Sequence, residues 1–288
     1  MPMLNDTPDR GGERLPARIL SAWRQKKAAP YDPARGGASA GTLIASYNVH
    51  KCVGADKRFD PARVAEVIRE INADIIALQE ADRRFGERAG LLDLLRLERE
   101  NGLCPVPITG RGNGHGWHGN LILFREGIVR DVHPIKLPGV EPRGALVVDL
   151  DLNAGPLRIV ATHLGLLRRS RAQQAEAILS AVYGRHERPT VLLGDLNEWR
   201  LGRRSSLQNL YPDFGPLTVA LPSFPSRMPV LALDRILADP HDLISRIEVH
   251  ATPLARVASD HLPIKARMDL TRAASLPPRE VRLAAGAR

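Results

Sequence analysis

The feature that most constrains this chain is a series of short apolar runs, each of which ends at a polar residue. Their length and content are those of buried β-strands. The clearest are TLIASYN (42–48), DIIALQE (74–80), LRIVATHL (157–164) and TVLLGD (190–195). Between the first two, Asp60 and Pro61 open a helix pattern with apolar residues on one face. A strand, a helix and a strand in about forty residues indicate a βαβ unit, so we expect an α/β fold.

The middle of the chain has a different pattern: β-like runs follow one another, with turns between them and no helix pattern. These runs are LILF (121–124), GIVRDVHPIKL (127–137), ALVVDLDL (145–152) and LRIVATHL. We expect them to be neighbouring antiparallel strands. A helix is predicted over 170–183, and VLALDRILA (230–238), LISRIEVH (243–250) and LPIKARMDL (262–270) are further strand candidates. The pattern predicts two packed mixed sheets with helices outside them.

Charge and composition set the limits of the domain. The chain of 288 residues has a formal charge of +9, of which residues 1–40 and 271–288 each carry +3. We therefore predict a flexible basic N-terminal arm (1–40), a catalytic domain (41–270) and a basic C-terminal tail (271–288). Because the excess charge lies mostly in the tails, it is weak support for DNA binding. The many arginines are explained at least as well by a coding bias toward Arg and Ala.

Cysteine content and hydropathy indicate where the protein works. Cys52 and Cys104 form no disulfide framework or zinc motif, which favours a reducing compartment. The N-terminus has no apolar stretch typical of a signal peptide, and no run approaches the ~20 residues of a membrane-spanning helix. We expect a cytoplasmic monomer, with the basic tails available for peripheral contact with an anionic membrane.

The chemistry is expected where polar residues stop the strands, since such positions stand on rigid supports. Taken singly, an Asp or Asn at a strand end is more often a turn or cap residue, and a lone His is more often a packing residue. Taken together, so many polar groups at the ends of buried strands are costly unless they serve a site. They are Asn48, Glu80, His163, Asp195, Asn197, Asp234, Asp260 and His261. Carboxylate and amide oxygens suit Mg²⁺ or Mn²⁺, which favours hydrolysis of phosphate esters.

Six segments in this order resemble the endonuclease/exonuclease/phosphatase superfamily over about 42–270. They are YNVH (47–50), LQE (78–80), THL (162–164), GDLN (194–197), LDRI (233–236) and SDHLPI (259–264). The resemblance implies a four-layer α/β sandwich of two mixed β-sheets flanked by helices. It also implies one metal-dependent site, in which direct attack by an activated water hydrolyses a phosphate ester with no covalent intermediate.

The same resemblance implies roles residue by residue. Glu80 is similar to the principal metal ligand, with Asn48 and Asp260 completing the metal shell. Asp195 resembles the residue that orients or deprotonates water, Asn197 an amide on a phosphate oxygen, and His261 the histidine at the scissile phosphate. Asp234 then orients His261, and His163 resembles a second histidine that donates to the phosphate or the leaving oxygen. Asn120 and Arg143 resemble phosphate-binding positions. Whether Asp195 or His261 is the general base stays open.

Several other motifs have two interpretations. GRGNGHGWHGN (110–120) contains a formal GxGxxG, but it leads into a strand instead of opening a helix, so we expect a rim loop with His115 and His118. RRSRAQQ (168–174) is either a phosphate-gripping arm or the solvated start of a helix. Phe224, Arg227 and Met228 either contact substrate or pack behind Asp234.

The substrate also has two interpretations. The first is a phosphodiester of the kind that a nuclease-like enzyme hydrolyses, which the THL motif favours. The second is a phospholipid or phosphoinositide head group at a membrane surface. A binding module without activity is a third reading, which the intact motifs oppose.

Overall fold

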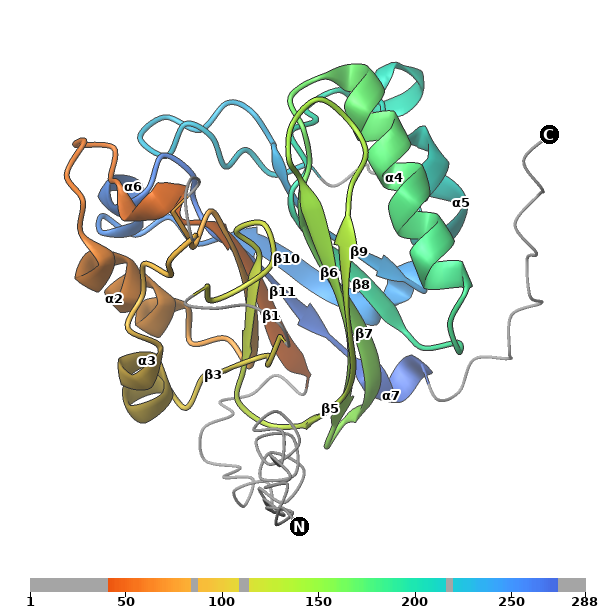
Figure 1. The fold of residues 1–288 in the computed structure, drawn as a ribbon, viewed down its shortest axis with the longest axis horizontal. Coiled ribbons are helices and arrows are strands. Elements are labelled where there is room, and N and C mark those ends of the chain that lie inside the picture. The colour runs from red at the N-terminus through yellow and green to blue at the C-terminus, as the bar shows by residue number, and fades with distance from the viewer. Residues whose placement is uncertain (1–40, 84–87, 109–113, 216–219, 274–288) are drawn as a thin grey trace, which may run out of the picture.

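Two β-sheets pack face to face, and helices cover the outer face of each (Figure 1). The computed structural model describes residues 41–83, 88–108, 114–215 and 220–273. The first sheet has six strands in the order β10-β11-β1-β2-β4-β3, and the second has five in the order β5-β6-β7-β8-β9. The predicted four-layer α/β sandwich is confirmed. Of the predicted arm and tail, residues 1–40 and 274–288 lie outside the described residues.

The strands of the first sheet are β1 (Thr42–Asn48), β2 (Ile75–Gln79), β3 (Cys104–Pro105), β4 (Leu121–Phe124), β10 (Ile244–Val249) and β11 (Ile264–Met268). Those of the second are β5 (Ile128–Lys136), β6 (Gly144–Leu152), β7 (Gly155–His163), β8 (Thr190–Asp195) and β9 (Asp234–Asp239). Both sheets are mixed, because β1 runs parallel to β2 and β7 runs parallel to β8, whereas the other pairs are antiparallel.

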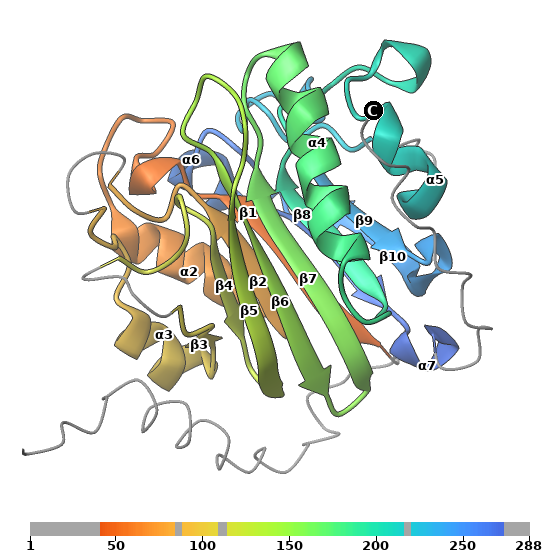
Figure 2. The same ribbon diagram turned by 45° about the vertical axis from the view of Figure 1, so that its right-hand side comes forward.

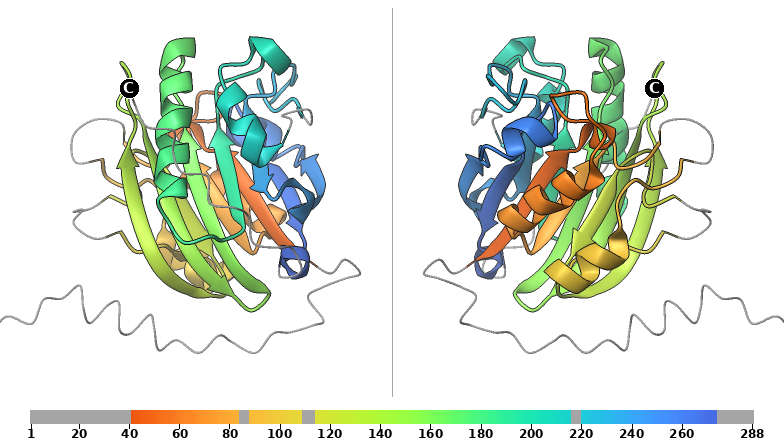
Figure 3. Two further views of the ribbon diagram at one scale, coloured as in Figure 1. Left: turned by 90° about the vertical axis from the view of Figure 1, so that its right-hand side faces the viewer. Right: turned by 90° about the vertical axis from the view of Figure 1, so that its left-hand side faces the viewer.

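Helices form the two outer layers, which Figure 3 shows edge-on. α2 (Pro61–Ile71), α3 (Leu94–Asn101) and α6 (Ala255–Ala258) belong to the layer of the first sheet, and α4 (Arg168–Tyr183) and α5 (Tyr211–Phe214) to that of the second. α4 lies along the outer face of the second sheet (Figure 2). Short helical turns complete the elements: η2 (His50–Cys52), η3 (Gly202–Arg204), η4 (Gln208–Leu210), η5 (His241–Leu243) and α7 (Leu270–Ala273).

The core has three apolar layers. Side chains such as Ile44, Leu146 and Ile159 fill the space between the sheets. A second cluster packs α2 against the first sheet, and a third packs α4 against the second. Local sequence explains α2 well, since the carboxylate of Asp60 accepts a hydrogen bond from the Arg63 backbone N–H at 2.9 Å and Pro61 occupies the first turn.

The structure corrects two element boundaries and adds one helix. α4 begins at Arg168 and not at Ser170, and α3 was not expected at all because Leu97 is its one buried residue. The run over 230–238 is only partly a strand, since β9 begins at Asp234. Asp234 is therefore the first residue of a strand and does not lie within one. Among the described residues, no helix has the length and apolar content to cross a membrane.

Strand register brings the predicted residues to one end of the molecule, the upper end in Figure 1. Asn48 ends β1 beside Gln79 of β2, while β4 and β11 begin at the same end. In the second sheet, Thr162 at the end of β7 pairs with Ala145 near the start of β6, and β5 ends beside Gly144. We call this the site end.

Candidate active site

Three neighbouring strands place polar residues in one row across the second sheet. His163 of β7 pairs in register with Asp195 of β8, which pairs with Asp234 of β9. The first sheet contributes Asn48 at the end of β1 and Glu80 directly after β2. The rigid ends of both sheets therefore hold the side chains, as expected from the sequence.

Gly194 lets β8 approach β7 closely just before Asp195. Its φ is +145°, and a Cβ there would lie 1.8 Å from the carbonyl oxygen of Thr162. Only glycine adopts this backbone conformation at such close range without strain. The glycine of the GDLN segment thus fixes where the Asp195 carboxylate points.

Asp195 lies at the centre of the site. Asn48 Nδ2 donates a hydrogen bond of 3.0 Å to its Oδ2, and the backbone N–H of Asn197 donates one of 3.0 Å to its Oδ1. His163 Nε2 and His261 Nε2 lie 3.4 and 3.7 Å from the same Oδ2. Asp195 is 2% exposed, so a buried carboxylate stands between two imidazoles and an amide.

His261 is held by Asp234. The two side chains are joined through His261 Nδ1 and Asp234 Oδ2 at 2.9 Å, and Ser223 Oγ donates to the same Asp234 oxygen. The Phe224 ring packs on the imidazole with 4.8 Å between ring centroids. Burial lowers the pKa of His261, but the negative charges of Asp234 and Asp195 outweigh it and raise the pKa well above its usual value. His261 is therefore favoured in its protonated form.

His163 has the opposite character. Burial lowers its pKa to about 3, and the positive charges of Arg143 and Lys51 act in the same direction, against the raising effect of Asp195. His163 is a neutral imidazole, able to donate one N–H. Two histidines beside one carboxylate thus differ in charge because their neighbours differ.

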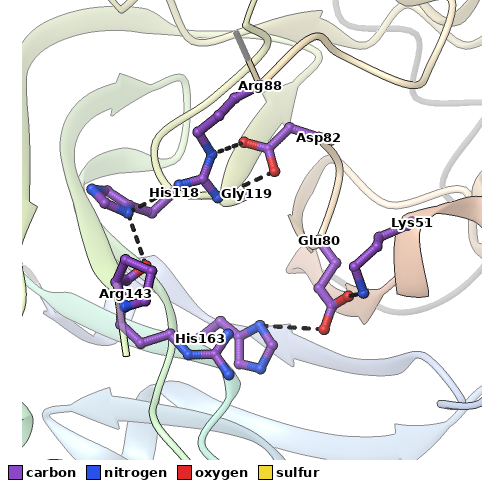
Figure 4. A pocket seen from close by; sticks show the side chains of 9 residues that line it. Lys51, Glu80, Asp82, Arg88, His118, Gly119, Arg143 and His163 are labelled. Carbon is purple, nitrogen blue, oxygen red and sulfur yellow. Dashed lines mark hydrogen bonds and ion pairs between the residues drawn. The ribbon is translucent and has the colours of Figure 1, made fainter. Parts of the chain in front are cut away.

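Glu80 faces a pocket next to these residues (Figure 4). Its backbone has a φ of 55°, a conformation that is rare for a residue with a side chain and often marks a functional position. Lys51 Nζ pairs with Glu80 Oε2, and His163 Nδ1 lies 3.9 Å from Oε1. Burial raises the pKa of Glu80, but the hydrogen bond and charge of Lys51 prevail and the pKa lies below its usual value.

The remaining predicted residues differ in where their side chains lie. Asn197 also has a left-handed backbone, and its Nδ2 donates to the carbonyl of Leu164 at 3.0 Å, so the amide braces the loop after His163. Arg143 lines the pocket and pairs with Glu141 at 2.8 Å. The Asp260 carboxylate lies 3.5 Å from His50 Nδ1.

Asn120 offers an unused acceptor. Its amide group donates to the carbonyls of Trp117 and Gly144, each at 3.0 Å. Its buried Oδ1 has no hydrogen-bond partner within the described part of the chain. A buried acceptor without a partner is costly, and a ligand with an O–H or N–H group would satisfy it.

The structure adds pocket residues that the sequence did not single out. Lys51, Asp82 and Arg88 line the pocket with His118 and Gly119 (Figure 4). Arg88 Nε donates to Asp82 Oδ2 at 2.9 Å. The nearest signal was the position of Lys51, directly after YNVH. The expected rim loop is confirmed for His118, whereas His115 Nε2 lies 2.8 Å from the carbonyl oxygen of Leu92.

Of the two interpretations of RRSRAQQ (168–174), the solvated helix start does not hold for Arg171. Arg171 is 1% exposed, and its guanidinium donates to the carbonyls of Gly165 and Leu166 at 3.2 and 2.5 Å. It also lies 3.3 Å from Glu198 Oε2, and Glu198 follows Asn197 directly. The Arg171–Glu198 pair therefore joins the loop after His163 to the loop after Asp195. Arg168 and Arg169 are exposed, as expected.

The donor set fits a hard divalent cation. Glu80 presents a carboxylate to the pocket, and that carboxylate already holds a positive charge, the Lys51 ammonium. Asn48 lies on the adjacent strand, as a supporting oxygen donor would. Donor atoms of Asp195, Asp234 and His261 also lie within 4.8 Å of one another. The hydrogen bond between His261 and Asp234 makes that pair an orienting device more than a pair of ligands.

Fold and site together define a phosphoester hydrolase. The family model described as "Endonuclease/Exonuclease/phosphatase family" matches residues 45–261, and the chain belongs to this family of enzymes. The chain is 26% identical over 254 residues to the uncharacterized protein YbhP of Escherichia coli K12, covering 79% of this chain and 96% of YbhP.

Solved structures share the fold at lower identity. An endonuclease/exonuclease/phosphatase from Bacteroides vulgatus superposes with a TM-score of 0.61 at 18% identity, over 80% of this chain and 99% of that one. D. rerio TDP2 complexed with single-strand DNA product gives a TM-score of 0.57 at 15% identity, over 80% and 99% of the two chains.

Proposed function

We propose that this enzyme is a Mg²⁺-dependent hydrolase of phosphate diesters, with Mn²⁺ as an alternative ion, and that an activated water attacks the phosphorus directly. The observation that carries the proposal is the environment of Asp195. A buried carboxylate that already accepts hydrogen bonds from Asn48 and Asn197, between two imidazoles, is suited to bind and deprotonate a water.

Asp195 is the general base in this mechanism. His261 is committed through Nδ1 to Asp234, and the surrounding carboxylates favour its charged form, which has no free lone pair to accept a proton. The water oxygen forms the new bond to phosphorus, its proton passes to Asp195, and the bond from phosphorus to the ester oxygen breaks. The protonated His261 stabilises the negative charge that builds on the phosphoryl oxygens.

The other side chains bind and orient the phosphate. Neutral His163 and the Arg143 guanidinium present donors to the pocket, and Lys51 adds a positive charge. Glu80, with Asn48 and Asp260 in support, would hold the metal ion, although Asp260 contacts His50 and Ser259 in this structure and not Glu80. When bound, the ion supplies Lewis acidity at a phosphoryl oxygen and offsets the charge of the leaving group.

A hydrolysis screen with a metal control tests the proposal. The full chain is assayed with Mg²⁺, with Mn²⁺ and with EDTA on bis-p-nitrophenyl phosphate, p-nitrophenyl phosphate, an oligonucleotide and phospholipids. We expect diester hydrolysis that EDTA abolishes. Hydrolysis that persists in EDTA at the same rate, or no hydrolysis of any ester with either ion, would contradict it.

A further inference from the structure

Large apolar side chains are exposed mainly at the site end. Among the described residues, ten large hydrophobic side chains are exposed, and eight of them lie on loops at this end. The eight are Phe59, Val140, Leu166, Leu167, Trp199, Leu201, Met228 and Val230. The other two, Leu95 and Tyr183, lie at the start of α3 and the end of α4. Scattered exposed apolar residues are ordinary, but a concentration at one end marks an interaction surface.

Strand order and register place the loops that carry these eight residues at the site end. Val140 lies between β5 and β6, and Leu166 and Leu167 directly follow β7. Trp199 and Leu201 follow β8, while Met228 and Val230 precede β9. The backbone N–H of Leu166 donates to Glu141 at 2.7 Å, so the loops of Val140 and Leu166 are neighbours. Phe59 precedes α2 on the side of the first sheet. We call these eight side chains the apolar rim.

Basic side chains alternate with the apolar rim. Four of the five rim segments read KRF (57–59), LLRR (166–169), WRLGRR (199–204) and RMPV (227–230), and none of these four contains an acidic residue, whereas Glu141 follows Val140 in the fifth. Their cations are at least partly exposed and are Lys57, Arg58, Arg168, Arg169, Arg200, Arg203, Arg204 and Arg227. Apolar side chains beside cations match a surface that is apolar inside and negatively charged outside.

We propose that the apolar rim docks the site end onto an anionic lipid membrane. Six of its eight members are aliphatic, whereas single-stranded nucleic acid is gripped by aromatic side chains on which bases stack. Membrane contact thus arises at the mouth of the site, in addition to the contact expected of the basic tails. It follows, and this step rests on the proposed function, that the substrates are phosphate esters of lipid head groups.

Vesicle binding tests the docking surface without turnover. The full chain is sedimented in EDTA with vesicles of phosphatidylcholine alone and of phosphatidylcholine with phosphatidylglycerol. The test variant carries Leu166→Ser, Leu167→Ser and Val230→Ser, and the control carries Leu95→Ser, which replaces a similarly exposed leucine away from the site end. Every chain keeps both basic tails, so a difference between variants reports the rim alone.

We expect the wild type and Leu95→Ser to bind the anionic vesicles alike, and the triple variant to bind at least about tenfold more weakly. Quenching of tryptophan emission by brominated lipid should fall in Trp199→Phe. The triple variant should hydrolyse a soluble diester like the wild type but lose hydrolysis of vesicle phospholipid. Absence of any diester hydrolysis would refute the proposed function and leave the binding result valid.

The docking surface would be overturned by a wild type that binds no anionic vesicles, or by a triple variant that binds them as tightly as the wild type. If that triple variant also lost binding to a fluorescent oligothymidylate, the rim would be assigned to nucleic acid.

Discussion

Asn48 and Asp195 stand 147 residues apart, and a hydrogen bond of 3.0 Å joins Asn48 Nδ2 to Asp195 Oδ2. Asn48 ends a strand of the first sheet and Asp195 ends a strand of the second, so this bond connects the two sheets at the site end. The Oδ1 atom of Asn48 accepts the His50 backbone N–H at 3.0 Å. Asn48 therefore holds Asp195, the proposed base, and the loop at His50 at the same time.

Replacing Asn48 should weaken both stability and catalysis. Asn48→Ala leaves Asp195 buried with one donor fewer, and we expect a loss of about 1–3 kcal/mol in the free energy of unfolding. Denaturant unfolding measures it, and turnover of a diester should also fall. Asn153→Ala, an exposed asparagine on the β6–β7 turn, is the control and should change neither. Equal stability of the two variants would rule out a role for Asn48 in joining the sheets.

Glu80→Gln should weaken metal binding because it removes the negative charge of the proposed principal ligand. We expect the Mg²⁺ concentration for half-maximal activity to rise about 10–100-fold. Mn²⁺ titration followed by electron paramagnetic resonance measures binding without substrate. Glu66→Gln, on the outer helix α2, is the control. Unchanged Mn²⁺ affinity in Glu80→Gln would place the ion elsewhere.

Arg171 should affect catalysis indirectly, because it holds the loops that follow His163 and Asp195 in place. Arg171→Met leaves Glu198 buried without its guanidinium partner, and we expect a loss of about 3–5 kcal/mol in stability. Where the variant is folded, kcat should fall while KM changes little, because the loops that follow His163 and Asp195 lose their connection.

The double variant Arg171→Met with Glu198→Gln provides the control for Arg171. It removes both charges, so it should regain stability relative to Arg171→Met while kcat stays low. A double variant with the summed losses of the two single variants would show that the residues act independently.

Gly194→Ala should be far more damaging than Gly202→Ala. A Cβ at Gly194 would clash with the Thr162 carbonyl, whereas at Gly202, also with a positive φ, it would meet nothing within 4 Å. We expect at least about 1–3 kcal/mol of destabilisation at Gly194 and about 1 kcal/mol at Gly202. Thermal unfolding of both variants checks this. Similar melting temperatures would mean that β8 can move away from β7.

Most of the fold and the residues that the structure brings together were predictable, because buried strands have a strong local signal. Asn48, His163 and Asp195 each end an apolar run, which marked them as candidates, and the family resemblance predicted that they share one site. α3 was missed because a helix with one buried residue has almost no apolar periodicity. Asp234 was placed inside a strand because the apolar residues 230–233 continue the pattern without joining the sheet.

Long-range contacts were beyond prediction from sequence. The exposed Arg168 and the buried Arg171 belong to the same RRSR run. They differ because Arg171 pairs with Glu198, which the sequence does not reveal. The apolar rim is equally hidden, since its members are spread over residues 59–230 and only the fold gathers them at one end.

Turnover of the Asp195→Asn variant tests the central claim most directly. The amide keeps the size of the carboxylate and one of its two hydrogen-bonded acceptor oxygens but cannot accept the water proton, so kcat for a soluble diester with saturating Mg²⁺ should fall at least about 10²-fold. Asp242→Asn, an exposed carboxylate on η5, should match the wild type. A folded Asp195→Asn enzyme that retains wild-type, Mg²⁺-dependent turnover would contradict the assignment of Asp195 as the base.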